Sequence, residues 1–177
     1  LNAMQRMSAI ATKTAGYLLL INSTDTKIID TRKTTPGIRV LEKWAVRIGG
    51  GENHRFGLYD MMMLKDNHIA VAGNITAAVQ RAKFHAPILT KIEVECDHLD
   101  QVKEAMASGV DVIMLDNMSN EDMIKSVKIV GKRIPLECSG GVRLETVRGK
   151  AETGVDYISV GRITQSATCV DIGLDDV

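Results

Sequence analysis

The sequence predicts an α/β fold, namely an open or incomplete parallel α/β barrel of about six strands, similar to a TIM barrel. Short β-rich runs alternate with helical patterns along the chain, which implies parallel strands covered by helices on the outside. Polar side chains follow nearly every run, as they do in a barrel, whereas an open doubly wound sheet gathers its site at one switch point. Only six such runs are visible, so we expect the barrel to be incomplete.

The elements follow from hydrophobic periodicity. The first is predicted as a helix, because apolar residues recur at helical spacing between Met4 and Leu18. The β-rich runs are predicted as strands at Lys27–Thr31, Met61–Lys65, Lys91–Cys96, Val110–Leu115, Ile134–Cys138 and Tyr157–Val160. Apolar periodicity between these runs predicts helices at Ile38–Ile48, Ile75–Phe84, Leu99–Ala107, Asn120–Val130 and Leu144–Glu152.

Boundary signals support these helices. Ser119 and Asp122 form the pattern of a capping box, with Asp in place of the usual Glu or Gln. Glycine stands where helix C-caps are expected, at Gly109, Gly131 and Gly154. No linker divides the chain, and 45% of its residues are hydrophobic, so we interpret residues 1–177 as one domain with a sizeable core. Because the helical pattern is already under way at Leu1, we expect further residues to precede it.

Composition argues against several classes of partner. The formal net charge is zero, so nothing in the total suggests nucleic acid or an anionic membrane. No apolar run approaches the length of a membrane span, and no signal-peptide pattern is present. A reducing cytoplasm is indicated by cysteines that fit neither a zinc spacing nor a disulfide framework, namely Cys96, Cys138 and Cys169. The spacing of His68, His85 and His98 does not match that of metal ligands. We predict that His85 and His98 lie on the surface.

The charges are segregated along the chain. Cations predominate between Arg32 and His68, and acidic residues predominate between Glu93 and Asp122. We interpret this segregation as a cationic and an acidic half-site, suited to an anionic substrate that is bound with a divalent metal. The alternative is that many of these charges only cover helices.

The first predicted strand runs into a basic segment. Thr31, Arg32 and Lys33 are followed by hydroxyl residues and a Pro-Gly turn. The planar fork of arginine suits carboxylate or phosphate, and lysine adds a compact charge. The segment therefore predicts an anion receptor, with a solvated basic loop as the alternative.

A second basic segment follows residues 49–51, a glycine run that we interpret as a flexible loop. His54 and Arg55 stand there, and we favour contact with an anion over pairing with Glu52. Lys65 closes the next apolar run, so its ammonium group is expected at a strand end. Such a lysine binds a carboxylate or, with a depressed pKa, forms a Schiff base, and the sequence leaves both roles open.

Acidic residues end two neighbouring strands. Glu95 and Asp116 occupy these ends, and Glu93 shares a strand face with Glu95 because side chains alternate. A carboxylate inside a barrel needs a cation, a hydroxyl or a metal as its partner. We therefore predict ribose hydroxyls and Mg²⁺ as partners, with Glu95 and Asp116 as metal ligands. Ion pairs with Lys65 or Arg32 are the alternative.

Glycine clusters end the last two predicted strands. The two clusters are Ser139-Gly140-Gly141 and Ser159-Val160-Gly161-Arg162. Barrels often bind phosphate between their final two strand–helix loops, where glycine exposes backbone N–H groups. Either cluster alone is a weak signal, because helix-packing turns also use glycine, but the two together predict a phosphate site.

These motifs together resemble the quinolinate phosphoribosyltransferases, the carboxylating nicotinate-nucleotide pyrophosphorylases, and the resemblance covers the whole chain. The segments that carry it are Leu1–Thr12, Asp30–Gly37, Leu41–Lys43, Gly49–Leu58, Lys65–His68, Glu93–Glu95, Leu115–Asn117, Ser139–Gly141 and Gly154–Gly161. The motifs are specific, since a related molybdenum-locus family usually lacks the Lys-Asp-Asn-His form that stands at positions 65 to 68.

The resemblance implies a barrel domain preceded by an N-terminal α/β sandwich domain, which has no counterpart in this chain, in a homodimer or higher oligomer. It implies transfer of a phosphoribosyl group from phosphoribosyl pyrophosphate to quinolinate, with decarboxylation and with Mg²⁺. The products are nicotinate mononucleotide for NAD biosynthesis, CO₂ and pyrophosphate. In the family the partner subunit contributes an arginine from the N-terminal domain, so this chain alone is expected to be a barrel core that can lack activity.

The resemblance also implies roles for single residues. The quinolinate carboxylates would be held, beside Thr31, by Arg32, His54, Arg55 and Lys65. Phosphoribosyl pyrophosphate, with its ribose and metal, would be met by Lys33, Glu95 and Asp116. Its 5′-phosphate would be held by Ser139, Gly140, Gly141, Gly161, Arg162, Ile163 and Gln165. The catalytic residues would be Lys65, Glu95 and Asp116. Many members have His in place of Gln165 and a small residue in place of Arg162, so the phosphate site is expected to be altered and not lost.

Two other functions remain open from the sequence. A phosphate-binding barrel lyase of the aldolase type would use Lys65 to form a Schiff base. A non-catalytic, truncated barrel would act as an oligomer scaffold or a ligand sensor.

Overall fold

The computed structural model describes residues 1–175 and contains one sheet of short strands. Their bounds are β1 Lys27–Ile29, β2 Met62–Leu64, β3 Ile92–Cys96, β4 Val112–Asp116, β5 Leu136–Ser139 and β6 Tyr157–Ser159. All neighbouring strands are parallel, in the order β1-β6-β5-β4-β3-β2. The sheet is therefore not closed, with β1 and β2 as its outermost strands, and the predicted open α/β barrel is confirmed.

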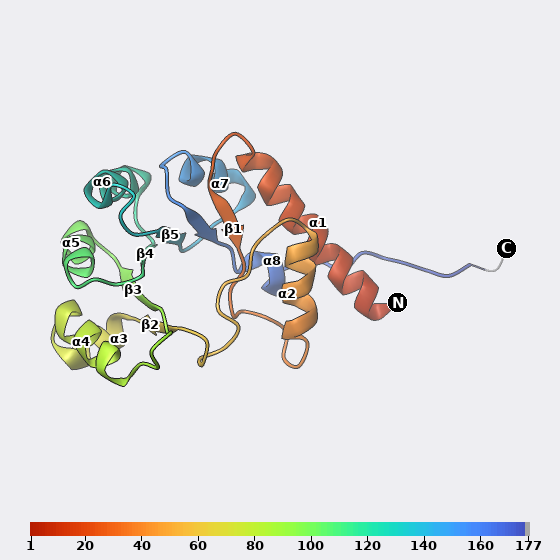
Figure 1. The fold of residues 1–177 in the computed structure, drawn as a ribbon. Helices are drawn as coiled ribbons and strands as arrows, with labels where there is room; N and C mark the ends of the chain where they lie inside the picture. The colour runs from red at the N-terminus through yellow and green to blue at the C-terminus, as the bar shows by residue number, and fades with distance from the viewer. Residues whose placement is uncertain (176–177) are drawn as a thin grey trace.

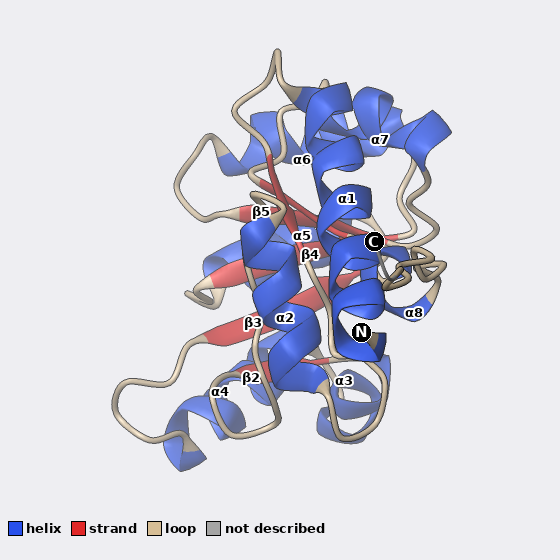
Figure 2. Cartoon of the chain, turned by 90° about the vertical axis from the view of Figure 1, so that its right-hand side faces the viewer, coloured by secondary structure: helices blue, strands red, loops and turns tan. Residues whose placement is uncertain are grey.

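Helices cover the outer side of this sheet (Figure 1). Their bounds are α1 Asn2–Ile21, α2 Arg39–Ile48, α3 Asp66–Ala72, α4 Ile75–His85, α5 Leu99–Ala107, α6 Asn120–Val130, α7 Leu144–Ala151 and α8 Arg162–Gln165. Figure 2 shows α1 and α2 side by side, and α1 also packs against β1 and α7. Within the described residues, none of these helices has the length and apolar character needed to span a membrane.

The two faces of the sheet differ in chemistry, because side chains alternate along each strand. In β4, Ile113 and Leu115 are fully buried in the hydrophobic core under the helices, whereas Met114 and Asp116 line the barrel interior. The neighbouring strands add further polar side chains to the interior, namely Glu95, Glu137, Ser139 and Ser159. In a typical TIM barrel, layers of branched apolar side chains fill the interior. Here polar side chains stand at these inward positions, which indicates a binding site at this end of the barrel.

Most predicted elements are confirmed, with small shifts at their ends. Half of the predicted capping box is present, since the Asp122 N–H donates to Ser119 Oγ at 3.1 Å, whereas the Asp122 carboxylate accepts from Ser119 Oγ at 3.0 Å and not from the Ser119 backbone N–H. The periodicity does not predict α3, which follows β2 directly and begins where the Lys65 N–H donates to His68 Nδ1 at 3.0 Å. It does not predict α8 either, because four residues are too few to show a helical period.

After α2 the chain returns along the outer edge of β1 and pairs with it. The Glu52 N–H donates to Ile28 O at 2.8 Å, and the Asp30 N–H donates to Glu52 O at 3.2 Å, so residue 52 forms a parallel bridge with this edge. This path carries His54 and Arg55 to the end of the barrel where the strands finish.

The glycine run that begins this path is closely packed. A Cβ on Gly49 would lie 2.4 Å from Ala11 O, and a Cβ on Gly51 would lie 2.8 Å from Thr14 Cγ2. Any larger residue would push the segment away from α1. The expectation of a flexible loop is therefore wrong, because these glycines allow a close approach to the helix.

Candidate active site

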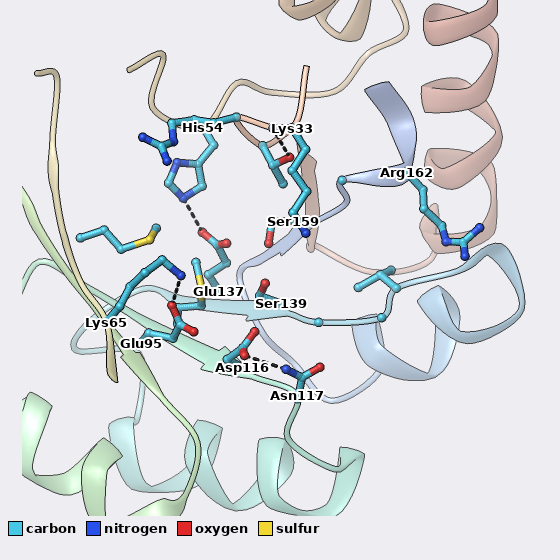
Figure 3. Close-up of a pocket in the computed structure, with 18 of the residues that line it drawn as sticks. Lys33, His54, Lys65, Glu95, Asp116, Asn117, Glu137, Ser139, Ser159 and Arg162 are labelled. Carbon is cyan, nitrogen blue, oxygen red and sulfur yellow. Dashed lines mark hydrogen bonds and ion pairs between the residues drawn. The ribbon is translucent and has the colours of Figure 1, made fainter. Parts of the chain in front are cut away.

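A cavity of about 510 Å³ lies at the C-terminal ends of the strands (Figure 3). With one exception, the predicted site residues all line it: Thr31, Arg32, Lys33, His54, Arg55, Lys65, Glu95, Asp116, Ser139, Gly140, Gly141, Gly161, Arg162 and Gln165. The exception is Ile163, whose side chain is fully buried in the hydrophobic core and whose N–H donates to Val160 O at 3.3 Å. Ile163 is therefore corrected from a binding residue to a packing residue.

Glu137 also lines the cavity, and sequence reasoning missed it. It stands inside β5 and not at the strand end, where polar residues attract attention. The signal that would have found it is alternation, because Glu137 lies two residues before Ser139 and so shares its inward face.

One end of the cavity is cationic. Arg32 and Arg55 line it, and within residues 1–175 neither forms an ion pair with a carboxylate. Lys33 also has no carboxylate partner among these residues, and its side chain lies beside Gly161, where an added Cβ would be 3.1 Å from Lys33 Cδ. Arg55 donates instead to Met61 O at 3.3 Å and contacts Met63 Sδ at 3.5 Å. Burial and the charge of Arg32 lower the pKa of Arg55. The charge of these groups is therefore available to an anionic ligand.

Beside this cationic end, Lys65 forms an ion pair with Glu95 Oε2 (Figure 3). The pairing of Glu95 with Lys65, one of the alternatives left by the sequence, is therefore present in the structure. Asp116 lies nearby at the end of β4, where its Oδ2 accepts a hydrogen bond from Asn117 Nδ2 at 2.7 Å. Glu95 and Asp116 come from neighbouring strands and place two carboxylates on one wall of the cavity.

Beneath the cavity, the His54 ring meets two glutamates inside the barrel, Glu93 and Glu137, of which Figure 3 shows Glu137. Its Nε2 lies 3.2 Å from Glu93 Oε2 and 3.2 Å from Glu137 Oε2. The three side chains are almost fully buried, and both oxygens of Glu93 lack a hydrogen-bond partner within the described residues. The ligand atoms lie within 4.8 Å of one another, which is close enough for a metal ion or a shared proton.

Hydrogen-bond geometry favours a shared proton over a metal. The Arg55 N–H donates to His54 Nδ1 at 2.6 Å, so a neutral ring carries its hydrogen on Nε2, toward the glutamates. Burial lowers the pKa of His54, but hydrogen bonds and charge from Glu137 and Glu93 outweigh it and raise the value to about 10. A second ring proton would have to sit on Nδ1, where it would point at the hydrogen of the Arg55 N–H and displace that hydrogen bond. We therefore place the extra proton of the cluster on the glutamate pair, where burial and the charge of Glu137 raise the pKa of Glu93 to about 7.

We expect the melting temperature of the wild-type chain to fall relative to that of Glu93→Gln as the pH rises from 4.5 to 7. The folded chain favours the protonated carboxyl, so this stabilisation is complete below the ordinary pKa of 4.5 and is lost as pH rises through about 7. Glutamine resembles the protonated form at every pH. Scanning calorimetry in metal-free buffer measures the difference, and a constant difference across this range would contradict the assignment.

The opposite end of the cavity is built from the loop after β5. Neither Gly140 nor Gly141 uses its backbone N–H in a hydrogen bond within the described residues, so both groups are available to an anion. Gly140 has a φ of 93°, and a Cβ there would lie 2.1 Å from Asn117 Oδ1 and 2.9 Å from Asn117 N. The Asn117 N–H donates to Ser139 O at 3.1 Å, which joins this loop to the end of β4. The arrangement suits a phosphate group.

The two adjacent glycines provide a matched pair of variants. We expect Gly141→Ala to cost roughly 1–2 kcal/mol of stability, because its φ of 59° is left-handed but nothing lies within 4 Å of the added Cβ. Gly140→Ala should cost clearly more and weaken the binding of inorganic phosphate, since it also pushes Asn117 away. Thermal melting and phosphate titration compare the two, and equal effects would contradict the close approach.

Comparison with known proteins supports this geometry. A family model described as "Quinolinate phosphoribosyl transferase, C-terminal domain" matches residues 10–175. The chain belongs to this family. The quinolinate phosphoribosyl transferase fold and the predicted family are thereby confirmed, whereas the roles of single residues stay predictions.

Individual relatives agree with the family match. The probable nicotinate-nucleotide pyrophosphorylase (carboxylating) of Bacillus subtilis is 48% identical over 175 residues, which cover 99% of this chain and 61% of that protein. The structure of nicotinate-nucleotide pyrophosphorylase from Ehrlichia chaffeensis aligns with a TM-score of 0.94 at 48% identity, covering 99% of this chain and 64% of that one. NadC from Streptococcus pyogenes gives a TM-score of 0.94 at 45% identity, with 97% and 60% covered. The chain thus spans about three fifths of the length of these quinolinate phosphoribosyl transferase relatives.

Proposed function

We propose that this chain forms the active-site barrel of a carboxylating nicotinate-nucleotide pyrophosphorylase. The enzyme would convert quinolinate and phosphoribosyl pyrophosphate into nicotinate mononucleotide, CO₂ and pyrophosphate, in NAD biosynthesis. The observation that carries the proposal is one cavity with two anion-binding ends, in which cations without carboxylate partners among the described residues face a glycine loop with free N–H groups. The names of the relatives support it.

In the proposed reaction, the cationic end binds the two adjacent carboxylates of quinolinate. Arg32 and Arg55 offer planar forks for them, and Lys65 adds a third charge. The ring nitrogen then forms a bond to the ribose C1 while the bond from C1 to pyrophosphate breaks. Positive charge develops on the ribose, and the carboxylates of Glu95 and Asp116 stabilise it. Holding both substrates in one orientation supplies much of the rate enhancement.

Decarboxylation follows once the ring nitrogen is quaternary. The bond from C2 to its carboxylate breaks, CO₂ leaves, and the electron pair stays on C2 beside the positive nitrogen. A proton then replaces the lost group. The cavity contributes by holding the departing carboxylate among the cations that line it.

The residues at the end of β3 and β4 fit a magnesium ion. Mg²⁺ prefers oxygen ligands, and Glu95 and Asp116 offer carboxylate oxygens on one wall of the cavity. When bound there, Mg²⁺ would neutralise the charge of the pyrophosphate leaving group. We propose these two residues as its ligands, with Lys65 released from Glu95 to the quinolinate carboxylate.

A lyase that uses Lys65 as a Schiff base is the competing function. Nucleophilic lysines are activated in apolar pockets or beside other cations, but Lys65 is half-exposed and forms an ion pair with Glu95. We therefore expect borohydride in the presence of carbonyl substrates to leave Lys65 unmodified, as peptide mass spectrometry would show. A reduced adduct at Lys65 would favour the lyase.

We also propose a homodimer or higher oligomer in a reducing compartment such as the cytoplasm. The cysteines carry free thiols, of which Cys96 and Cys138 are buried and Cys169 is exposed. An exposed free thiol is stable where disulfides do not form. Light scattering measures the oligomeric state directly.

The decisive experiment uses the protein as its gene encodes it. Quinolinate, phosphoribosyl pyrophosphate and Mg²⁺ are supplied, and nicotinate mononucleotide and pyrophosphate are measured. Calorimetry with each substrate separates binding from turnover. Absence of product together with absence of binding heat would favour the non-catalytic barrel.

A further inference from the structure

A buried ion pair lies behind the cationic end of the cavity. Lys43 Nζ donates to Asp30 Oδ1 at 2.5 Å, and the two side chains are 4% and 0% exposed. Asp30 Oδ1 also accepts the His54 N–H at 2.9 Å, and Asp30 Oδ2 accepts Asn53 Nδ2 at 2.6 Å. Lys43 Nζ donates in addition to His54 O at 3.0 Å. The ion pair therefore bonds both backbone polar groups of His54, because Asp30 accepts from its N–H and Lys43 donates to its C=O.

This network joins two segments that are far apart in the sequence. Asp30 lies two residues before Arg32, and His54 lies directly before Arg55. One carboxylate thus anchors the two chain segments that bring Arg32 and Arg55 to the cavity. Asn53 strengthens the link, because its Nδ2 also donates to Lys43 O at 2.9 Å on α2. The relative position of the two arginines depends on this anchor.

Stability alone does not account for such a pair. Charges lose hydration when buried, and replacing a buried ion pair by apolar residues of similar size is often neutral or stabilising. Burial accordingly raises the pKa of Asp30 and lowers that of Lys43, the directions that disfavour their charged forms. What apolar residues would not supply is the set of hydrogen bonds that fixes the His54 peptide.

We propose that Asp30 and Lys43 are positioning residues, which set the spacing of Arg32 and Arg55 for the two adjacent carboxylates of the substrate. This inference rests on the proposed function, because quinolinate is the ligand of that end. Neither residue lines the cavity, so both act through the backbone of the segments that they hold.

The test compares an apolar double variant with a matched control. Asp30→Leu combined with Lys43→Met removes the two charges together and so leaves no unpaired buried charge, while the N–H and C=O of His54 lose their side-chain partners. The control is Thr26→Val, which removes a buried hydrogen bond from Thr26 Oγ1 to Val155 O, 2.7 Å long, before the opposite end of β1. Asp30→Asn is the conservative variant. It keeps the shape of the side chain and one acceptor oxygen, so it should retain part of the quinolinate affinity that the double variant loses.

We expect the double variant to weaken quinolinate binding roughly 10–100-fold, as measured by calorimetry, because outer residues that orient ligands typically matter to this extent. Binding of inorganic phosphate at the glycine loop should change less than about twofold, because distant sites without shared partners usually influence each other by no more than this. Thr26→Val should leave both affinities unchanged. Unaltered quinolinate affinity in the double variant, or equal losses for both ligands, would overturn the proposal.

Hydrogen exchange provides a readout that does not depend on substrate. In the double variant, exchange of residues 52–60 should become faster even where the melting temperature is unchanged, and in Thr26→Val it should not. If the wild-type protein binds no quinolinate, the proposed function fails while this measurement still decides the anchoring role. Unchanged exchange in residues 52–60 would overturn it.

Discussion

Arg55→Ala is expected to weaken quinolinate binding by about 2–4 kcal/mol, the range seen when one partner of a buried charge pair is removed. The Arg55 side chain is partly buried at the cavity, and within residues 1–175 it pairs with no carboxylate. Among the described residues, the polar contacts of the Arg55 guanidinium are the carbonyl oxygen of Met61 and the sulfur atom of Met63. A substrate carboxylate would therefore be its main anionic partner, and calorimetric titration with quinolinate measures the loss.

Two further variants sharpen this result. Arg55→Lys keeps the charge but loses the planar fork, so its affinity should fall between those of the wild type and the alanine variant. Arg148→Ala removes a surface arginine that pairs with Glu152 on α7, and it should leave the affinity unchanged. If quinolinate binds Arg55→Ala as tightly as the wild type, Arg55 does not belong to the binding end.

The arrangement of strands could be predicted from the sequence because two local signals agree. Apolar runs mark the strands, and polar residues such as Glu95, Asp116 and Ser139 mark the ends where parallel strands meet. All parallel strands of a barrel end at the same edge, where the cavity lies. A prediction of the residues at the strand ends is therefore also a prediction of most residues that line the cavity. This explains why only Ile163 among the predicted site residues lies elsewhere.

What the sequence could not show depends on contacts across the barrel. Glu137 lies inside a strand, and its contact with His54 forms only in the folded chain, where β5 and the segment after α2 face the same cavity. The pair of Asp30 and Lys43 likewise joins β1 to α2 by a contact that no local pattern encodes. Such residues look like ordinary charged positions in a linear reading, and only burial distinguishes them.

Glu95→Gln is expected to lower kcat by roughly 10²–10³-fold, as loss of one group that stabilises developing charge does in other enzymes. The carboxylate faces the cavity from β3 and carries the negative charge nearest to Lys65. Its removal takes away stabilisation of the ribose cation and one proposed metal ligand, and both losses act on the reaction step. Quinolinate binding should not weaken, because Lys65 is freed from its ion pair and can meet a substrate carboxylate instead.

This split between kcat and affinity distinguishes a catalytic carboxylate from one that only holds Lys65 in place. If Glu95 served only to orient Lys65, the glutamine variant would bind quinolinate more weakly and turn over bound substrate almost normally. Single-turnover kinetics and calorimetry separate the two outcomes. Glu121→Gln is the matched control, since that exposed carboxylate pairs with Lys125 on α6 and lies outside the cavity, so neither quantity should change.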